Sequence, residues 1–172
     1  MANPYIGIVN RQLVFARYQC SSQLEETNAA ERLRNQGALY AGIWHLGLAY
    51  KNYIAEVGAN YKLAKPELSE NAEGLRVALE SMNKGPAEAT ELARLEREGF
   101  IAEILDALQS IEQVAPDMVA PAPSDMEEPN PLKLVDISGA KEKIAFGFDD
   151  LAHWIQQFKD LVGRHREHMV EY

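Results

Sequence analysis

The residues best suited to chemistry share one stripe of a helix expected over residues 28–61. His45, Asn52 and Glu56 follow one another at steps of seven and four, which places an imidazole, an amide and a carboxylate on one face among small residues. Such groups could bind a polar ligand or transfer a proton in hydrolysis. His45 and Glu56 are eleven residues apart, about 16 Å along a helix axis, so they cannot touch and each needs its own partner. A ligand site and satisfied polar residues at a helix crossing both remain open.

Two other groups of polar residues have the wrong spacing for known catalytic or metal sites. Asp150 and His153 form a single acid-x-x-His pair, whereas a di-metal bundle needs a Glu-x-x-His pair on each of two helices. Segment 164–168 places two histidines three apart, whereas the zinc-protease motif places them four apart, and its spacing also differs from that of HEPN-type helical ribonucleases. Phosphate-binding loops, paired cysteines and nucleophile elbows are absent from the sequence. We therefore expect no catalytic residue, no metal ligand and no cofactor.

Composition and charge exclude several classes of protein. The 172 residues are 47% hydrophobic, which suffices for one core and predicts a single domain over 1–172. A net charge of −9 disfavours nucleic-acid binding. The single cysteine excludes an intramolecular disulfide, and the apolar stretches are too short or too charged for a signal peptide or a membrane span. The sequence predicts a cytoplasmic protein without nucleic-acid or membrane partners.

Hydrophobic periodicity predicts an all-α fold, a bundle of four to five helices. The expected helices cover residues 4–25, 28–61, 66–82 and 86–114, followed by a last helix that begins near Ser138 or near Asp149. Pro4, Pro66 and Pro86 are expected in first turns, where a missing N–H costs nothing. Residues 116–137 contain five prolines and are expected to form a Pro-rich, acidic linker or surface loop before the last helix.

The second helix is expected to be long and central. Its apolar seam alternates steps of four and three, as in helix bundles, through Leu39, Ile43, Leu46, Tyr50, Tyr53 and Val57. The same helix contains four glycines, each of which lowers helix propensity by about 1 kcal/mol. Packing on more than one side must therefore stabilise it.

Several segments resemble a family of small gammaproteobacterial cytosolic proteins classed as a domain of unknown function. They are Asn10–Arg17, Gly37–Tyr61 with its His45-Leu46 pair and Glu56, and Phe158–Tyr172. The resemblance covers nearly the whole chain and is weakest in the Pro-rich stretch. It implies no catalytic residues, because the family has no known activity. It does imply that Arg17, His45 and Glu56 match recurring family positions.

These observations favour a non-enzymatic bundle that acts as a protein-interaction or oligomerisation module. Arg11 and Arg17, with no acid before Glu25, make the N-terminal helix locally positive and suited to an acidic protein partner. The alternative is a bundle that binds a small ligand or performs an unrecognised hydrolysis with polar residues of the second helix. The candidate ligand or interaction residues are Arg17, His45, Asn52 and Glu56. A third possibility is an adaptor that captures basic clients through acidic residues in 98–132.

Overall fold

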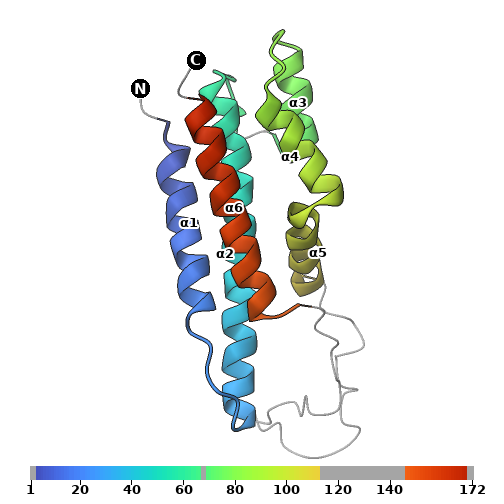
Figure 1. The fold of residues 1–172 in the computed structure, drawn as a ribbon. Helices are drawn as coiled ribbons and strands as arrows, with labels where there is room; N and C mark the ends of the chain where they lie inside the picture. Colours follow the sequence, from blue (N-terminus) through green and yellow to red (C-terminus); the bar gives the residue numbers. More distant parts are fainter. Residues whose placement is uncertain (1–2, 67–68, 113–145, 170–172) are drawn as a thin grey trace, which may run out of the picture.

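The computed structural model describes residues 3–66, 69–112 and 146–169, and within these ranges the protein forms six α-helices and no strand. Figure 1 shows them in chain order. They are α1 (Tyr5–Cys20), α2 (Ala29–Asn60), α3 (Ala72–Glu80), α4 (Ala87–Glu98), α5 (Phe100–Glu112) and α6 (Phe148–Met169). The all-α prediction is confirmed. The expected Pro-rich, acidic loop at 116–137 lies outside the described residues.

Polar caps fix the first two helix starts where the sequence predicts them. The Asn3 side chain accepts the backbone N–H of Tyr5 just before α1. At α2, Asn28 Oδ1 accepts the N–H of Glu31 at 3.0 Å, and the Glu31 carboxylate accepts the N–H of Thr27 at 2.8 Å. This arrangement resembles a capping box in which the Glu31 carboxylate accepts from Thr27 instead of from the N–H of Asn28. Because α1 ends at Cys20, the predicted extension to residue 25 is wrong.

The helix predicted over 66–82 starts later than expected. Pro66 lies in a short turn, and α3 begins only at Ala72, where Asn71 Oδ1 accepts the Gly74 N–H at 2.7 Å. Asn71 lies in extended backbone about one third of the way along the expected helix, and the cap that its side chain supplies sets the start of α3. Pro66 instead packs on α2, since a Cβ added at Gly58 would lie 2.8 Å from the Pro66 Cβ.

The helix predicted over 86–114 is two helices. Gly99 separates α4 from α5 in an extended conformation, with φ −139° and ψ −172°. A Cβ at this position would lie 2.7 Å from Leu95 Cδ2, so the close turn favours a residue without a side chain. The apolar spacing continues across Gly99, because both helices face the same core. The periodicity of the sequence therefore did not predict the break.

The last helix begins at Phe148, which selects the later of the two starts left open by the sequence. Asp150 Oδ2 accepts the backbone N–H of Gly147 at 2.7 Å. Asp149 and Asp150 both lie in the first turn, where negative charge interacts favourably with the positive end of the helix dipole. Asp150 therefore stabilises a helix start, and its spacing from His153 has a structural explanation.

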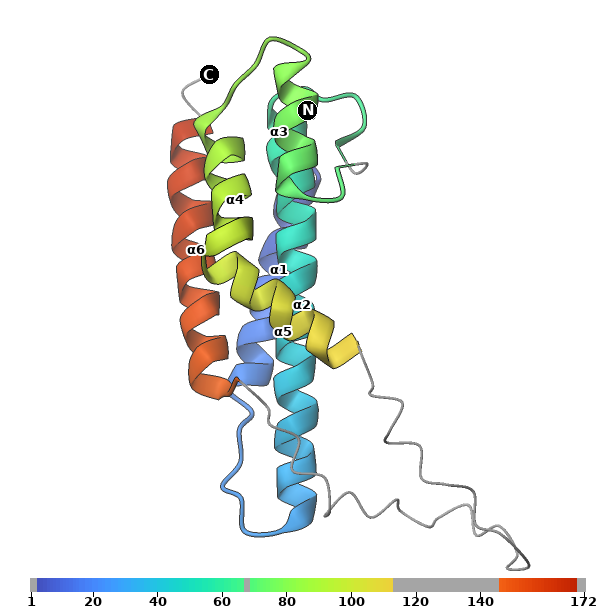
Figure 2. The same cartoon turned by 90° about the vertical axis from the view of Figure 1, so that its right-hand side faces the viewer.

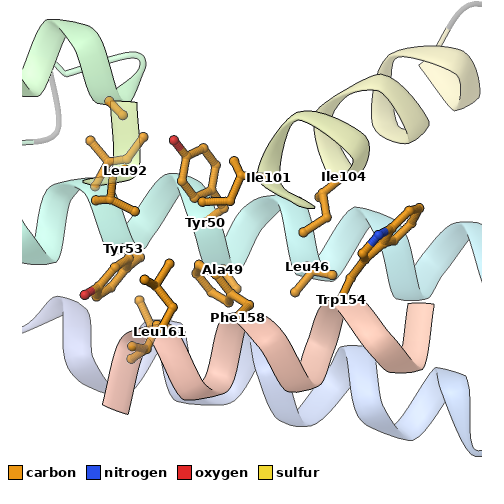
Figure 3. Close-up of a cluster of buried hydrophobic side chains, with 14 of the residues drawn as sticks. Leu46, Ala49, Tyr50, Tyr53, Leu92, Ile101, Ile104, Trp154, Phe158 and Leu161 are labelled. Carbon is orange, nitrogen blue, oxygen red and sulfur yellow. The ribbon is translucent and has the colours of Figure 1, made fainter. Parts of the chain in front are cut away.

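The helices form a bundle around α2. Figure 1 shows α1, α2 and α6 running side by side, and Figure 2 shows α4 beside α6 with α5 crossing α2. The core cluster in Figure 3 joins α2, α5 and α6 through Tyr50, Tyr53, Ile104 and Phe158. The rings of Tyr53 and Phe158 meet edge to face, with centroids 5.7 Å apart. The central position predicted for the second helix is confirmed, and all six residues of its seam are buried.

Three of the four α2 glycines lie at close helix contacts. An added Cβ would lie 2.5 Å from Leu151 Cδ2 at Gly42 and 2.8 Å from Leu108 Cδ2 at Gly47. With Gly58 against Pro66, these glycines let α6, α5 and the segment before α3 approach α2 from different sides. Gly37 differs, because an added Cβ there meets nothing within 4 Å. None of the helices in the described ranges is long and apolar enough to cross a bilayer.

Candidate functional site

The predicted site residues occupy separate places in the bundle. Arg17 is exposed on α1. His45 Nδ1 lies 2.8 Å from Gln12 Oε1 of α1, and its ring centroid lies 5.2 Å from that of Phe15. Burial lowers the pKa of His45, so the imidazole is favoured in its neutral form. His45 thus bridges the α1–α2 contact with a ring and a hydrogen bond.

Asn52 and Glu56 are not joined to His45. Asn52 Nδ2 donates to the backbone oxygen of Leu48, one turn earlier in the same helix, at 2.7 Å. Glu56 is completely buried and pairs with Arg166 of α6. The polar stripe of α2 therefore divides into three local arrangements with different partners.

The Glu56 carboxylate is held in place by α1 and α6. Arg166 donates through Nε to Oε1 at 2.7 Å and through Nη2 to Oε2 at 2.8 Å, and its Nη1 donates to Asn10 Oδ1 at 2.9 Å. This two-bond geometry matches the planar guanidinium to the carboxylate. The hydrogen bonds that Arg166 donates to Glu56 raise the pKa of Arg166, so its guanidinium is held in the charged form. The arrangement ties three helices together at one end of the bundle.

A second buried network lies one residue away on α6. His165 is only 2% exposed, with Nδ1 2.9 Å from the Tyr53 hydroxyl and Nε2 2.9 Å from Glu91 Oε2. Arg164 Nη2 donates to the other oxygen of Glu91 at 2.6 Å. Burial raises the pKa of Glu91, but hydrogen bonds and charge from His165 and Arg164 outweigh it and the net shift is downward. The network connects α2, α4 and α6.

The second network joins an acid, an imidazole and a hydroxyl by hydrogen bonds, but its geometry does not suit catalysis. Tyr53 is fully buried, and burial raises the pKa of its hydroxyl, which disfavours the nucleophilic phenolate. His165 is equally enclosed, so a substrate has no route to the two reactive atoms. Within the described ranges, no cluster of three His, Cys, Asp or Glu side chains is placed to bind a metal ion.

Sequence reasoning missed the role of the last helical turns. Arg164, His165 and Arg166 are not simply cations at a helix C-terminus, because each pairs with an acid of α2 or α4. One signal was available: His165 continues the apolar seam of the last helix, and a histidine on a buried seam needs a polar partner. The identity of that partner depends on tertiary contacts 74 and 112 residues away in sequence.

A shallow hollow of about 620 Å³ lies at the same end of the bundle. It is lined by Tyr61, Lys84–Glu88 and His168. Two of its charged groups already have partners: Lys84 Nζ donates to the Tyr61 backbone oxygen at 2.6 Å, and Glu88 Oε2 accepts from the Tyr61 hydroxyl at 2.9 Å. The hollow therefore combines both charge signs and favours neither cations nor anions.

Large apolar side chains gather on the outer side of α1 and α2. Val14, Phe15 and Tyr18 of α1 are 63%, 43% and 68% exposed, and Trp44 of α2 is 46% exposed. Phe15 and Trp44 lie at the same level of the α1–α2 pair, because the Phe15 ring contacts His45, which follows Trp44 in α2. We call these four residues the aromatic face. None of the four belongs to the core cluster or to the partly buried side chains packed against it, so this face is available for contact with another molecule.

Comparison with known proteins places the chain in a family. No curated protein and no solved structure matches it. A family model described as a family of unknown function, DUF6586, matches residues 6–172, which include all six helices apart from the first residue of α1. The chain therefore belongs to this family of unknown function.

Proposed function

We propose that this protein is a non-enzymatic interaction module that binds another protein through the aromatic face. The observation that carries the proposal is the concentration of exposed apolar side chains there. Eight large hydrophobic residues are exposed in the described ranges, and four of them form this one face. Contiguous exposed apolar patches are a feature of protein interaction sites, and aromatic residues are enriched at their centres.

The remaining chemistry of the protein supports a binding role. The buried Glu56 pairs with Arg166, and the buried His165 pairs with Glu91. No observation favours the alternative of a ligand or hydrolytic site on α2, because His45, Asn52 and Glu56 have separate partners. A cytoplasmic location belongs to the same proposal, and the single cysteine is consistent with it.

Site-specific photo-crosslinking in cells tests the proposal. A photoreactive phenylalanine analogue replaces Tyr18 on the aromatic face or, as the matched control, exposed His153 on α6. We expect a discrete protein adduct from position 18 and none from position 153. The crosslinked protein, once purified, should form a complex of defined stoichiometry that Trp44→Ala abolishes without lowering the melting temperature. Equal adducts from both positions, or no adduct from position 18, would contradict the proposal.

A further inference from the structure

We infer that the aromatic face binds an acidic amphipathic helix of a different protein. This inference rests on the proposed function and adds the chemistry of the partner. It is argued from the charges around the face, from the positions of two arginines on α1, and from the uncharged part of α2 beside them.

The face lies on one positive and one uncharged helical segment of a strongly acidic chain. Residues 3–24 and 35–50 contain Arg11 and Arg17 but no Asp or Glu, whereas the whole chain has a net charge of −9. Both arginines are exposed, and no ion pair is formed by either with the described residues. An acid-free surface with two unpaired guanidinium groups is complementary to carboxylates.

Helix geometry places the two arginines on either side of Val14 and Tyr18. At about 100° per residue, Arg11 and Arg17 lie about 60° to either side of Val14 around α1. Tyr18 lies between Val14 and Arg11, and Phe15 lies further round, toward α2. Val14 and Tyr18 are therefore flanked by cations, whereas Phe15 lies beyond Arg11 on the side of α2. This pattern matches a ligand that has an apolar stripe bordered by acids.

The α2 side of the face is uncharged. From Gly37 to Tyr50 the helix contains no Asp, Glu, Lys or Arg, and Ala41 and Leu48 are half-buried between α1 and Trp44. An amphipathic helix that docks through its apolar face needs an uncharged, apolar surface of this kind. We therefore assign a helical segment as the ligand.

A second copy of this chain is the less favourable occupant. A two-fold dimer through the aromatic face would bring Arg11 and Arg17 of one copy against the same residues of the other, so like charges would oppose each other. Contact between the aromatic face and a different, acidic surface of another copy would not close and would produce filaments. A separate acidic protein meets neither difficulty.

Binding of designed peptides tests this inference. The probe is a fluorescently labelled amphipathic peptide of about 20 residues with Leu on one face and Glu on the other, compared with the same peptide carrying Lys for Glu. Fluorescence anisotropy gives Kd for the full-length protein. We expect the acidic peptide to bind about tenfold or more tightly than the basic one, and its affinity to fall when ionic strength rises from about 0.05 to 0.5 M.

Charge-reversal variants identify the surface. Arg11→Glu/Arg17→Glu should weaken binding of the acidic peptide by about tenfold. The control Lys65→Glu/Arg94→Glu makes the same change in charge at exposed positions outside the face and should bind like the unmodified protein. Circular dichroism melts of both variants should match the unmodified protein, because none of the four side chains is buried.

The outcomes separate this inference from the proposed function. If both peptides bind equally and Trp44→Ala abolishes binding, the interaction face stands and the acidic partner is wrong. If acidic binding is insensitive to Trp44→Ala, both fail. The inference is also overturned if neither peptide binds or if Arg11→Glu/Arg17→Glu has no more effect than its control. Sedimentation of a dimer or filament that Trp44→Ala dissociates would assign the face to self-association. Arginine-dependent binding to phosphatidylserine vesicles would assign it to membranes.

Discussion

The Arg166 guanidinium donates two hydrogen bonds to the Glu56 carboxylate, from Nε to Oε1 at 2.7 Å and from Nη2 to Oε2 at 2.8 Å. Glu56 is fully buried, whereas the Arg166 side chain is 25% exposed. The acid depends on this contact because water does not reach it. The arginine also bonds Asn10, so the pair connects α1, α2 and α6.

Replacement of Glu56 should therefore destabilise the protein strongly. Glu56→Gln keeps the shape of the side chain but removes the charge, and we expect the free energy of unfolding to fall by about 2–3 kcal/mol in urea denaturation. The control is Glu73→Gln, which removes an exposed acid paired with Arg76 in the same helix and should cost less than about 0.5 kcal/mol. Equal effects of the two substitutions would show that the buried pair has no special role in stability.

Glu91 should make stability sensitive to acid. Its pKa is lower in the folded protein than its ordinary value of 4.5, so the unfolded chain binds a proton first as pH falls. The stabilisation is fully present above pH 4.5 and is lost as pH falls from there through the folded pKa. Glu91→Gln should flatten the dependence of unfolding free energy on pH below 4.5, measured by urea titrations. An unchanged slope would contradict the role of Glu91.

His45 should make stability depend on pH in a separate and higher range. Burial lowers its pKa below the ordinary 6.5, so the unfolded chain again binds a proton before the folded one. Stability should be constant above that range and should decline as pH falls from 6.5 toward the folded pKa. His45→Gln keeps a polar group near Gln12 but cannot titrate. The variant should lack this decline, while the change below pH 4.5 remains.

Two glycines of α2 should respond in opposite directions to alanine. Gly37 is exposed and has open space around it, so Gly37→Ala should stabilise the helix by about 0.5–1 kcal/mol. At Gly42 the new methyl would lie 2.5 Å from a terminal methyl of Leu151, which is fully buried and has little room to move. We expect Gly42→Ala to destabilise by about 1–2 kcal/mol. Thermal denaturation of the two variants checks both signs, and stabilisation by both would show that α2 and α6 do not pack closely.

The fold could be predicted from the sequence where local signals agree. The seam of α2 and the Asn28 cap identify a long helix without tertiary information, because apolar spacing and capping act within a few residues. The errors occurred where such signals compete. Pro66 suggested a helix start that Asn71 determines, and continuous apolar spacing concealed the break at Gly99.

The candidate site was less predictable because polar side chains depend on distant partners. Glu56 was singled out on its own helix, but the arginine that neutralises it lies 110 residues later. His165 lies on the buried side of α6, but its acid, Glu91, lies 74 residues away in the sequence. The exposure of Trp44 and Tyr18 could not be predicted from the sequence either, because an aromatic residue in a helix can face the core or the solvent. Composition identifies such residues, and only packing shows which are left uncovered.

The central position of α2 also bears on how the protein unfolds. The contacts of α1, α3, α5 and α6 with this one helix mean that none of the four can keep its apolar surface covered once α2 is lost. The bundle should therefore behave as a single cooperative unit, with the slowest amide hydrogen exchange between Gly42 and Val57, where the buried residues of α2 are concentrated.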